Sequence, residues 1–129
     1  MATTSNSINL MFEKVNDLFQ TDLKTILVRE QQNENQINLY SVGEYWAAFE
    51  KSAYLLQQTI HDSHPPVILY VRQHPFPIVM HNVDAERVRD ICRRHTMTGK
   101  SLGCLQLQTQ PVDEQSYNKW YRQHVIEEE

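Results

Sequence analysis

Glycine is scarce in this sequence, with three residues in 129. Proteins that cradle phosphate groups use glycine-rich loops, so this chain has little room for such a loop. Long apolar runs are also lacking, and none is long enough to span a bilayer. The first nine residues, MATTSNSIN, have neither the basic nor the apolar region of a signal peptide. We therefore expect a cytoplasmic protein that does not associate with membranes.

Cysteine and positive charge are scarce as well. The two cysteines, Cys92 and Cys104, cannot form a disulfide framework and lack the spacing of metal ligands. Lys and Arg total 12 against 16 Asp and Glu, which gives a formal net charge of −4. This balance argues against non-specific binding of nucleic acid by bulk charge, although a local basic patch could still bind it.

The composition that remains is that of one globular domain. Hydrophobic residues make up 40% and charged residues 22%, and the length allows a real core. We find no linker, repeat or low-complexity tract. The sequence therefore predicts a single domain over residues 8–126, with flexible termini at 1–7 and 127–129.

Apolar spacing predicts four helices, at residues 8–19, 43–60, 85–95 and 111–125. The second has the strongest pattern, and one of its faces is formed by Tyr45, Phe49, Ser52, Ala53, Leu56 and Ile60. Asn82 or Asp84 is expected to cap the third helix, and Asp113 the fourth.

β-Type runs predict five strands, at residues 24–30, 37–42, 67–73, 78–83 and 101–108. The first two strands are expected to form one hairpin, and the next two a second hairpin. Gly103 suggests a close backbone approach in the last strand. Helices interleaved with hairpins predict an α/β or α+β fold, with a mixed sheet of about five strands flanked by about four helices.

Several catalytic and metal-binding motifs are incomplete. Residues 97–101, MTGKS, match only the end of a phosphate-binding loop, so we interpret Gly99 as the cap that ends a helix. The two cysteines fall on expected inner faces, which predicts buried, unreactive thiols. A metal cluster could be built from histidines at two turns, but no carboxylate or cysteine recurs beside them at ligand spacing. Those histidines are His61, His64, His74 and His81. We predict no metal site, no cofactor and no enzymatic activity.

Two features point instead to binding. One is a run of cations at the third helix and its exit, namely Arg87, Arg89, Arg93, Arg94 and Lys100. It could be a solvated helix face or a surface that contacts phosphates. The other is the adjacent pair Tyr45 and Trp46 at an expected helix start. Neighbouring side chains on a helix point about 100° apart, so at most one can lie at the centre of a buried stripe. The other could stack on a base, which is worth roughly 1–3 kcal/mol.

Residues 39–60, LYSVGEYWAAFEKSAYLLQQTI, resemble the N-terminal mismatch-recognition domain of the DNA mismatch-repair family MutS. That domain has a strand, then Gly-Asp-Phe-Tyr-Glu, then a helix. Residues 75–83, PFPIVMHNV, resemble the family's Pro-Ile-Pro-Met-rich strand, and residues 87–108 its following helix and final apolar strand. The resemblance covers about residues 37–108 and implies a mixed sheet flanked by helices.

The resemblance also implies a role for Tyr45, which stands where the family's Phe stacks on a mismatched base. The family's hydrogen-bonding Glu is replaced by Ala47, and MHNVDA stands in place of its Gly-x-Pro-x-His. The 129 residues leave no room for the family's clamp, lever and ATPase domains, so we do not expect this chain to carry out ATP-driven mismatch repair.

We therefore predict a non-catalytic module that binds DNA or RNA at mismatched, bulged or single-stranded sites. The predicted contact residues are Gly43, Tyr45, Trp46, Arg87, Arg89, Arg93, Arg94 and Lys100. The alternative is a protein–protein interaction or structural module, including self-association, that keeps the scaffold without binding nucleic acid. A third possibility is an enzyme that uses the turn histidines, and it would require bound metal.

Overall fold

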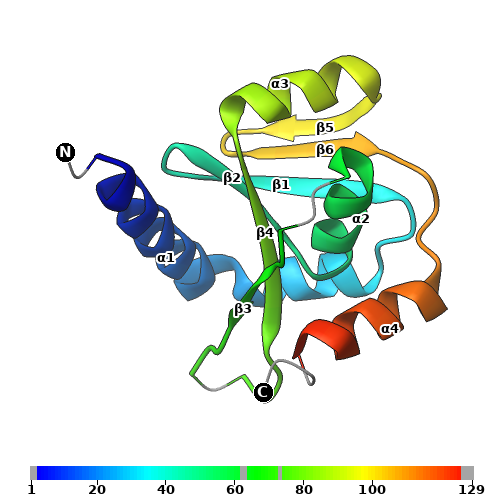
Figure 1. Cartoon of the computed structure of the whole chain (residues 1–129), viewed down its shortest axis with the longest axis horizontal. Helices are drawn as coiled ribbons and strands as arrows, with labels where there is room; N and C mark the ends of the chain where they lie inside the picture. Colours follow the sequence, from blue (N-terminus) through cyan, green and yellow to red (C-terminus); the bar gives the residue numbers. More distant parts are fainter. Residues whose placement is uncertain (1–2, 62–63, 73, 126–129) are drawn as a thin grey trace.

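The computed structural model describes residues 3–61, 64–72 and 74–125. Within these residues the chain forms four helices and six strands (Figure 1). In chain order they are α1 (Thr3–Gln31), β1 (Gln36–Val42), β2 (Tyr45–Phe49), α2 (Glu50–Ile60), β3 (Val67–Leu69), β4 (Ile78–Asp84), α3 (Ala85–Arg94), β5 (Met97–Ser101), β6 (Cys104–Gln108) and α4 (Glu114–Val125).

The six strands form one sheet in the order β3-β4-β2-β1-β6-β5. This confirms the expected α/β class, with one strand more than the five expected. In the described part of the chain all five pairings are antiparallel, whereas a mixed sheet would also contain parallel pairs. The edges are short or irregular, because β3 has three residues and β5 carries a register shift between Met97 and Gly99.

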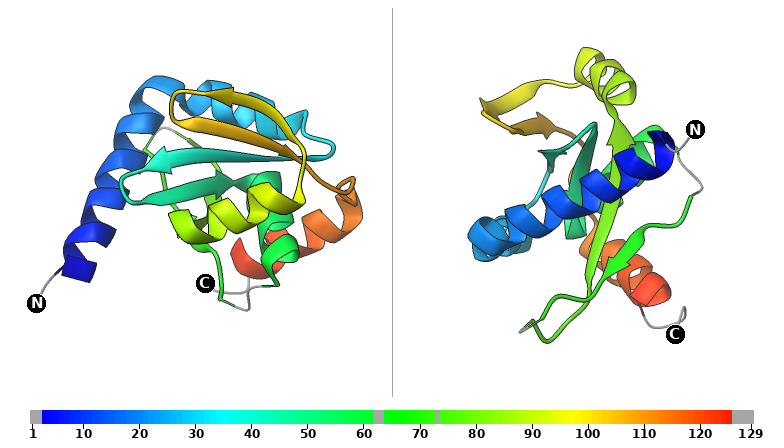
Figure 2. Two further views of the ribbon diagram at one scale, coloured as in Figure 1. Left: turned by 90° about the horizontal axis from the view of Figure 1, so that it is seen from above. Right: turned by 90° about the vertical axis from the view of Figure 1, so that its left-hand side faces the viewer.

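Helices cover both faces of the sheet (Figure 2). One face packs against α1, and the other packs against α2, α3 and α4. Strand β1 shows the division, because side chains alternate between the faces of a sheet. Ile37 and Leu39 belong to the cluster beneath α2, α3 and α4, whereas Tyr40 and Val42 belong to the cluster beneath α1.

The first correction concerns residues 24–30, which were expected to form a strand and instead continue α1. The helix is 29 residues long. Leu23, Ile26, Leu27 and Glu30 repeat at helical spacing, and all four side chains are buried or half-buried on the helix side that faces the sheet. Burial of this face outweighs the β-type preference of the Thr-Ile-Leu-Val run.

Helix α1 also begins at Thr3, inside the segment 1–7 that we expect to be flexible. Residues 1–2 and 126–129, which include the expected C-terminal tail, lie outside the described residues. Although α1 is long, no helix of the described ranges combines enough length and apolarity to cross a membrane.

The second correction concerns residues 43–49, which form a turn and a strand instead of the start of a helix. Strand β2 pairs with β1 on one side and with β4 on the other. Ala47, Ala48 and Phe49 are fully buried, because a central strand covered on both faces has no solvent side. The segment therefore lacks the alternation of a half-buried strand, and α2 starts only at Glu50.

The third correction concerns the segment after α3. Residues 97–101 form strand β5, so Gly99 does not cap a helix. A Cβ at Gly99 would collide with the side chain of Gln106 on the paired strand β6. At Gly103 the backbone of β1 does approach, since the Ser41 N–H donates to its carbonyl at 2.8 Å, but a Cβ there would meet nothing within 4 Å. Gly103 instead allows the β5–β6 turn through its positive φ of 77°.

Other expectations are confirmed. Strands β1 and β4 and helices α3 and α4 lie where the sequence predicts them, and β3 pairs with β4 as a hairpin. Strand β6 covers only the second part of the expected strand 101–108, because a turn at residues 102–103 interrupts it. Strand β3 is shorter than the expected 67–73, of which Gln73 is outside the described residues. Asp84 caps α3 by accepting the N–H of Arg87 at 2.8 Å. Asp113 accepts the N–H of Gln115 at 3.1 Å at the start of α4.

Candidate functional site

The predicted aromatic pair lies on β2, so its two side chains point to opposite faces of the sheet. Tyr45 is half-buried against the cluster beneath α1. Trp46 is half-buried against the cluster that contains Val88 and Ile91 of α3, a helix that contacts β2. Part of each ring is therefore covered by the protein's own core, and the two rings do not form one surface for stacking.

Both aromatic residues lie at one end of the sheet, which we call the hairpin end and define by the turn residues 43–44 and 102–103. The Ser41 N–H donates to the Gly103 carbonyl at 2.8 Å, which ties the two turns together. The Ser7 hydroxyl of α1 donates to Glu44 at 2.6 Å. The N-terminal part of α1, the β1–β2 turn and the β5–β6 turn therefore meet there (Figure 1). Leu102 is fully exposed at this end.

The predicted cations lie on two elements that follow one another in the chain, α3 and β5. Lys100 of β5 lies near Cys92 of α3, because its charge acts on that thiol. All five cations on them are exposed, and we call them the cationic surface: Arg87, Arg89, Arg93, Arg94 and Lys100. Asp84, Glu86 and Asp90 offset part of this charge, and Asp90 forms an exposed ion pair with Arg94 at 2.9 Å. Five cations and three carboxylates leave a formal local charge of +2 on a chain whose net charge is −4.

The start of α3 adjoins the hairpin end. Tyr45 pairs with Asp84 and Trp46 with Val83, so both lie beside the point where β4 leads into α3. Helix α3 then runs away from this end, because His95, just after the helix, contacts the Gln108 carbonyl at the other end of β6. Of the predicted cations, Arg87 and Lys100 are therefore the ones near the hairpin end, whereas Arg93 and Arg94 lie farther along the cationic surface. Gly43 is exposed in the β1–β2 turn, where its φ is 70°.

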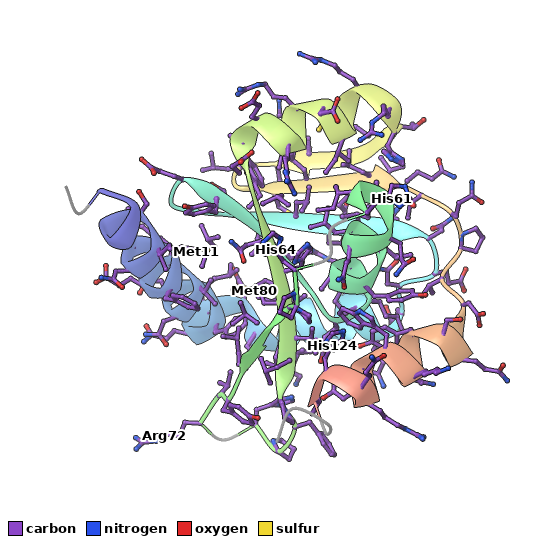
Figure 3. The ribbon with its side chains drawn as sticks, in the orientation of Figure 1. Met11, His61, His64, Arg72, Met80 and His124 are labelled. Carbon is purple, nitrogen blue, oxygen red and sulfur yellow. The ribbon has the colours of Figure 1, made fainter. Side chains whose placement is uncertain are left out.

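The turn histidines do not form a metal centre. His61 is exposed at the end of α2, whereas His81 is buried in β4. Figure 3 labels His61, at the end of α2, and His64, in the segment before β3. Across the described ranges, no group of three or more His, Cys, Asp or Glu side chains is arranged to hold a metal ion.

Both thiols are half-buried. Burial raises the pKa of Cys92, and the nearby Lys100 opposes this shift. Burial also raises the pKa of Cys104, against the opposing charge of Arg29, whose Nη1 lies 3.8 Å from the sulfur. Thiols with a raised pKa carry little thiolate at neutral pH, which agrees with the expectation of unreactive cysteines.

A second site, which the sequence did not predict, surrounds Glu50. A cavity of about 420 Å³ lies between the end of α1, the start of α2, the segment before β4 and α4. Its walls include Glu50, Phe76, Tyr117 and Tyr121. The Glu50 carboxylate accepts the Val79 N–H and the Tyr117 hydroxyl, both at 3.4 Å. Burial raises the pKa of Glu50 to about 7, with a further contribution from the charge of Glu30.

Glu30 also borders the cavity, and its carboxylate is the centre of a buried network. It accepts the Ser52 hydroxyl at 2.6 Å and the Ser52 N–H at 2.8 Å. It also accepts the side-chain amides of Asn38 at 2.9 Å and Asn33 at 3.2 Å. Burial raises the pKa of Glu30, and these hydrogen bonds lower it.

Sequence reasoning misses this site for a physical reason. Glu50 follows an apolar run and precedes a helical one, so it is indistinguishable from an ordinary acidic residue in the first turn of a helix. Its one unusual property is a positive φ of 52°, which no sequence pattern indicates for a glutamate. Glu30 lies inside the run 24–30, whose β-type composition hides the helical face on which it is buried.

No family model, curated protein or solved structure matches this chain.

Proposed function

We propose that this domain binds nucleic acid, with the cationic surface contacting phosphates and the hairpin end contacting bases. The observation that carries the proposal is that two consecutive elements of an otherwise acidic chain, α3 and β5, carry five exposed cations. Phosphate contacts by Lys and Arg supply affinity and fix the orientation of a protein on nucleic acid. The remaining negative charge of the chain favours contact through this one surface.

The hairpin end supports the second half of the proposal. Tyr45 and Trp46 keep part of their rings exposed, and Leu102 projects into solvent. Apolar side chains of this kind stack on unpaired bases or insert between base steps, while nearby cations hold the backbone. The resemblance to the mismatch-recognition domain of MutS, in which Tyr45 holds the stacking position, is part of the proposal. So is a cytoplasmic location.

The test is fluorescence anisotropy with labelled single-stranded, bulged, mismatched and fully paired oligonucleotides, between about 50 and 200 mM salt. We expect tighter binding to the first three, weakening as salt rises. Arg89→Ala/Arg93→Ala should reduce the slope of log affinity against log salt by about 2, which corresponds to two lost phosphate contacts. Tyr45→Ala should weaken binding with little change in that slope.

The matched control is Arg72→Ala/Arg122→Ala, which removes two exposed arginines from other parts of the molecule. Arg72 projects away from the sheet at the far end from α3 (Figure 3). This control should bind as the parent does. Equal binding by the parent and the Arg89/Arg93 variant would show that nucleic acid does not bind at the cationic surface.

A protein–protein interaction module is the second candidate, and a different surface favours it. A groove of about 620 Å³ runs between α1 and the chain on either side of residue 70. Phe12 and Tyr70 line the groove and are exposed, and exposed apolar patches mark interaction sites. Self-association that is lost in Phe12→Ser/Tyr70→Ser, in a parent that binds no oligonucleotide, would favour this candidate.

A further inference from the structure

The cavity beside Glu50 has the properties of a binding site that the proposed nucleic-acid function does not use. Its volume of about 420 Å³ lies in the range of small-molecule pockets. Its walls combine the aromatic rings of Phe76, Tyr117 and Tyr121 with the carboxylates of Glu30 and Glu50. An aromatic wall with a carboxylate is the combination that recognises organic cations.

The two carboxylates of the cavity differ in how fully they are engaged. Glu30 receives four hydrogen bonds of 2.6 to 3.2 Å, so its acceptor positions are filled from within the protein. Glu50 receives two contacts, both at 3.4 Å, the upper limit of a hydrogen bond. Glu50 therefore has acceptor capacity for a stronger donor that enters the cavity.

The other charged group on the cavity wall does not neutralise Glu50. The Lys51 ammonium forms an ion pair with Glu114 at 2.6 Å and donates to the Gln31 carbonyl at 3.3 Å. The remaining titratable groups facing the cavity are His74, Tyr117 and Tyr121. The wall holds two carboxylates, Glu30 and Glu50, against the single ammonium of Lys51, which disfavours an anionic occupant.

The backbone at Glu50 gives a separate reason to look for a role. Its φ of 52° lies in the left-handed region, which is costly for a glutamate and easy for a glycine. Non-glycine residues held in this region concentrate at functional sites, where the surrounding structure enforces the conformation. Strand β2 passes directly into α2 at this residue, so the conformation fixes the carboxylate at the cavity.

We propose that this cavity binds an organic cation, an alkylammonium or guanidinium group, with Glu50 as its counter-ion and the ring of Tyr121 as its aromatic wall, since the Lys51 ammonium already lies over the ring of Tyr117. The group could belong to a free small amine or to a lysine or arginine side chain of a peptide. Both present the same donor chemistry to the carboxylate. The hydroxyls of both tyrosines are already directed to acceptors, because Tyr121 donates to the Pro77 carbonyl at 2.6 Å and Tyr117 to Glu50.

The cation and a proton compete for the same carboxylate. Because burial raises the pKa of Glu50 to about 7, this group is partly protonated at neutral pH. Binding of a cation favours the ionised form, so it should release a proton near neutrality. The apparent affinity should then fall by about tenfold for each pH unit below the pKa.

The experiment is a titration of the full chain, followed by NMR shifts and calorimetry, with four cationic probes. Methylguanidinium and n-butylammonium represent free small cations. N-acetyl-arginine amide and N-acetyl-lysine amide represent side chains of a peptide. Methylurea is the neutral control for methylguanidinium. We expect saturable binding of at least one cationic probe, at least fivefold weaker methylurea binding, and weaker binding as the pH falls from about 8 to 6.

Two variants locate the site. Glu50→Gln should weaken cation binding at least fivefold and remove its pH dependence, whereas Glu13→Gln on the exposed side of α1 makes the same charge change and should have no effect. Tyr121→Leu removes one aromatic wall and should weaken binding while leaving the pH dependence in place. If Glu50→Gln does not fold, Tyr121→Leu still tests whether the cation binds in this cavity.

Tight binding of the free cations alone assigns the site to a small amine, and binding of the blocked amino acids assigns it to a peptide side chain. Both results support the proposal. Absence of binding by all four probes, or undiminished binding by Glu50→Gln, overturns it. The oligonucleotide experiment uses a different surface, so the failure of either proposal is distinguishable from the failure of the other.

Discussion

The two faces of the sheet are stabilised in different ways. The face beneath α2, α3 and α4 is apolar and aromatic, and its cluster contains Leu39, Leu56, Ile91 and Trp120. The face beneath α1 has an apolar cluster of its own, but its end carries the buried network around Glu30. Asn38 extends this network across the sheet, because its side-chain oxygen accepts the Gln106 amide at 3.0 Å.

This difference separates two kinds of stabilisation. Apolar burial is roughly proportional to area and tolerates small displacements of the packed groups. A buried hydrogen-bond network requires every partner in place, because a buried donor left without an acceptor costs about 1–3 kcal/mol. The apolar face therefore stabilises the fold in proportion to the apolar area that it buries. The network instead fixes the position of the end of α1 relative to β1 and α2.

The largest expected effect comes from removing the centre of the network. Glu30→Ala leaves the Ser52 N–H and the Asn38 amide without their acceptor and removes the strong hydrogen bond from the Ser52 hydroxyl, and we expect a loss of about 4 kcal/mol in the free energy of unfolding. Urea denaturation followed by circular dichroism measures it. Glu13→Ala, on the exposed side of the same helix, should change stability by less than about 0.5 kcal/mol. A similar small loss in Glu30→Ala would show that the network is not required.

Two neighbours on β1 compare the faces directly. Leu39 and Asn38 are both fully buried but point to opposite faces. Leu39→Ala should cost about 3 kcal/mol by leaving a cavity, and Asn38→Ala about 2 kcal/mol by removing one of the hydrogen bonds to Glu30 and the acceptor of the Gln106 amide. In a double-mutant cycle with Glu30→Gln, Asn38→Ala should show a coupling of about 1–2 kcal/mol and Leu39→Ala almost none. Equal coupling for both would remove the distinction between the faces.

The third effect depends on pH and concerns Glu50. Its pKa is raised in the folded state from an ordinary 4.5 to about 7, so the native state holds the proton more tightly than the unfolded state. The resulting stability is fully present below pH 4.5 and is lost as the pH rises through about 7. The side chain is partly exposed, so we expect a loss on the order of 2 kcal/mol.

Glu50→Gln carries no titrating group there, so its stability relative to the parent should rise between about pH 5 and pH 8. Urea denaturation of both proteins at the two pH values measures the change. Glu30 is present in both proteins, so its own titration is the same in each to first order. A pH-independent difference between parent and variant would contradict the raised pKa.

The smallest effect compares single hydrogen bonds on the two faces. Tyr40→Phe removes the acceptor of the Arg29 guanidinium, 2.9 Å away, on the α1 side. Tyr121→Phe removes the donor to the Pro77 carbonyl on the other side. Each should cost about 1 kcal/mol in thermal or urea unfolding. Equal costs would show that the two faces differ because of the network as a whole. A much larger cost for Tyr40→Phe would show that individual hydrogen bonds on the α1 side are stronger.

Much of the fold is predictable from the sequence because local patterns agree with the tertiary structure. Strands β1 and β4, helices α3 and α4 and the caps at Asp84 and Asp113 each have a short-range cause. The errors occur where burial overrides local preference. The run 24–30 is helical because Ile26 and Glu30 are buried on one helix face. Residues 45–49 form the central strand β2. Both of its faces are covered, so its residues lack the alternation of polar and apolar side chains by which a strand is predicted.

The candidate sites also differ in how far local sequence determines them. The cationic surface is predictable, because its arginines are close together in the sequence and lie on one helix. Its adjacency to Trp46 follows from the β2–β4 pairing, which a single sequence does not indicate. The cavity beside Glu50 joins α1, α2 and α4, so it depends on contacts between residues far apart in the chain.

The edges of the sheet have a consequence for how copies of this domain meet. Amyloid-like stacking and sheet extension need a long, regular edge with free backbone groups. Here one border offers three residues in β3, and the other is interrupted at Met97 and Gly99 and carries the charge of Lys100. A domain with such borders should remain dispersed at high concentration, and any assembly it forms must use its side chains.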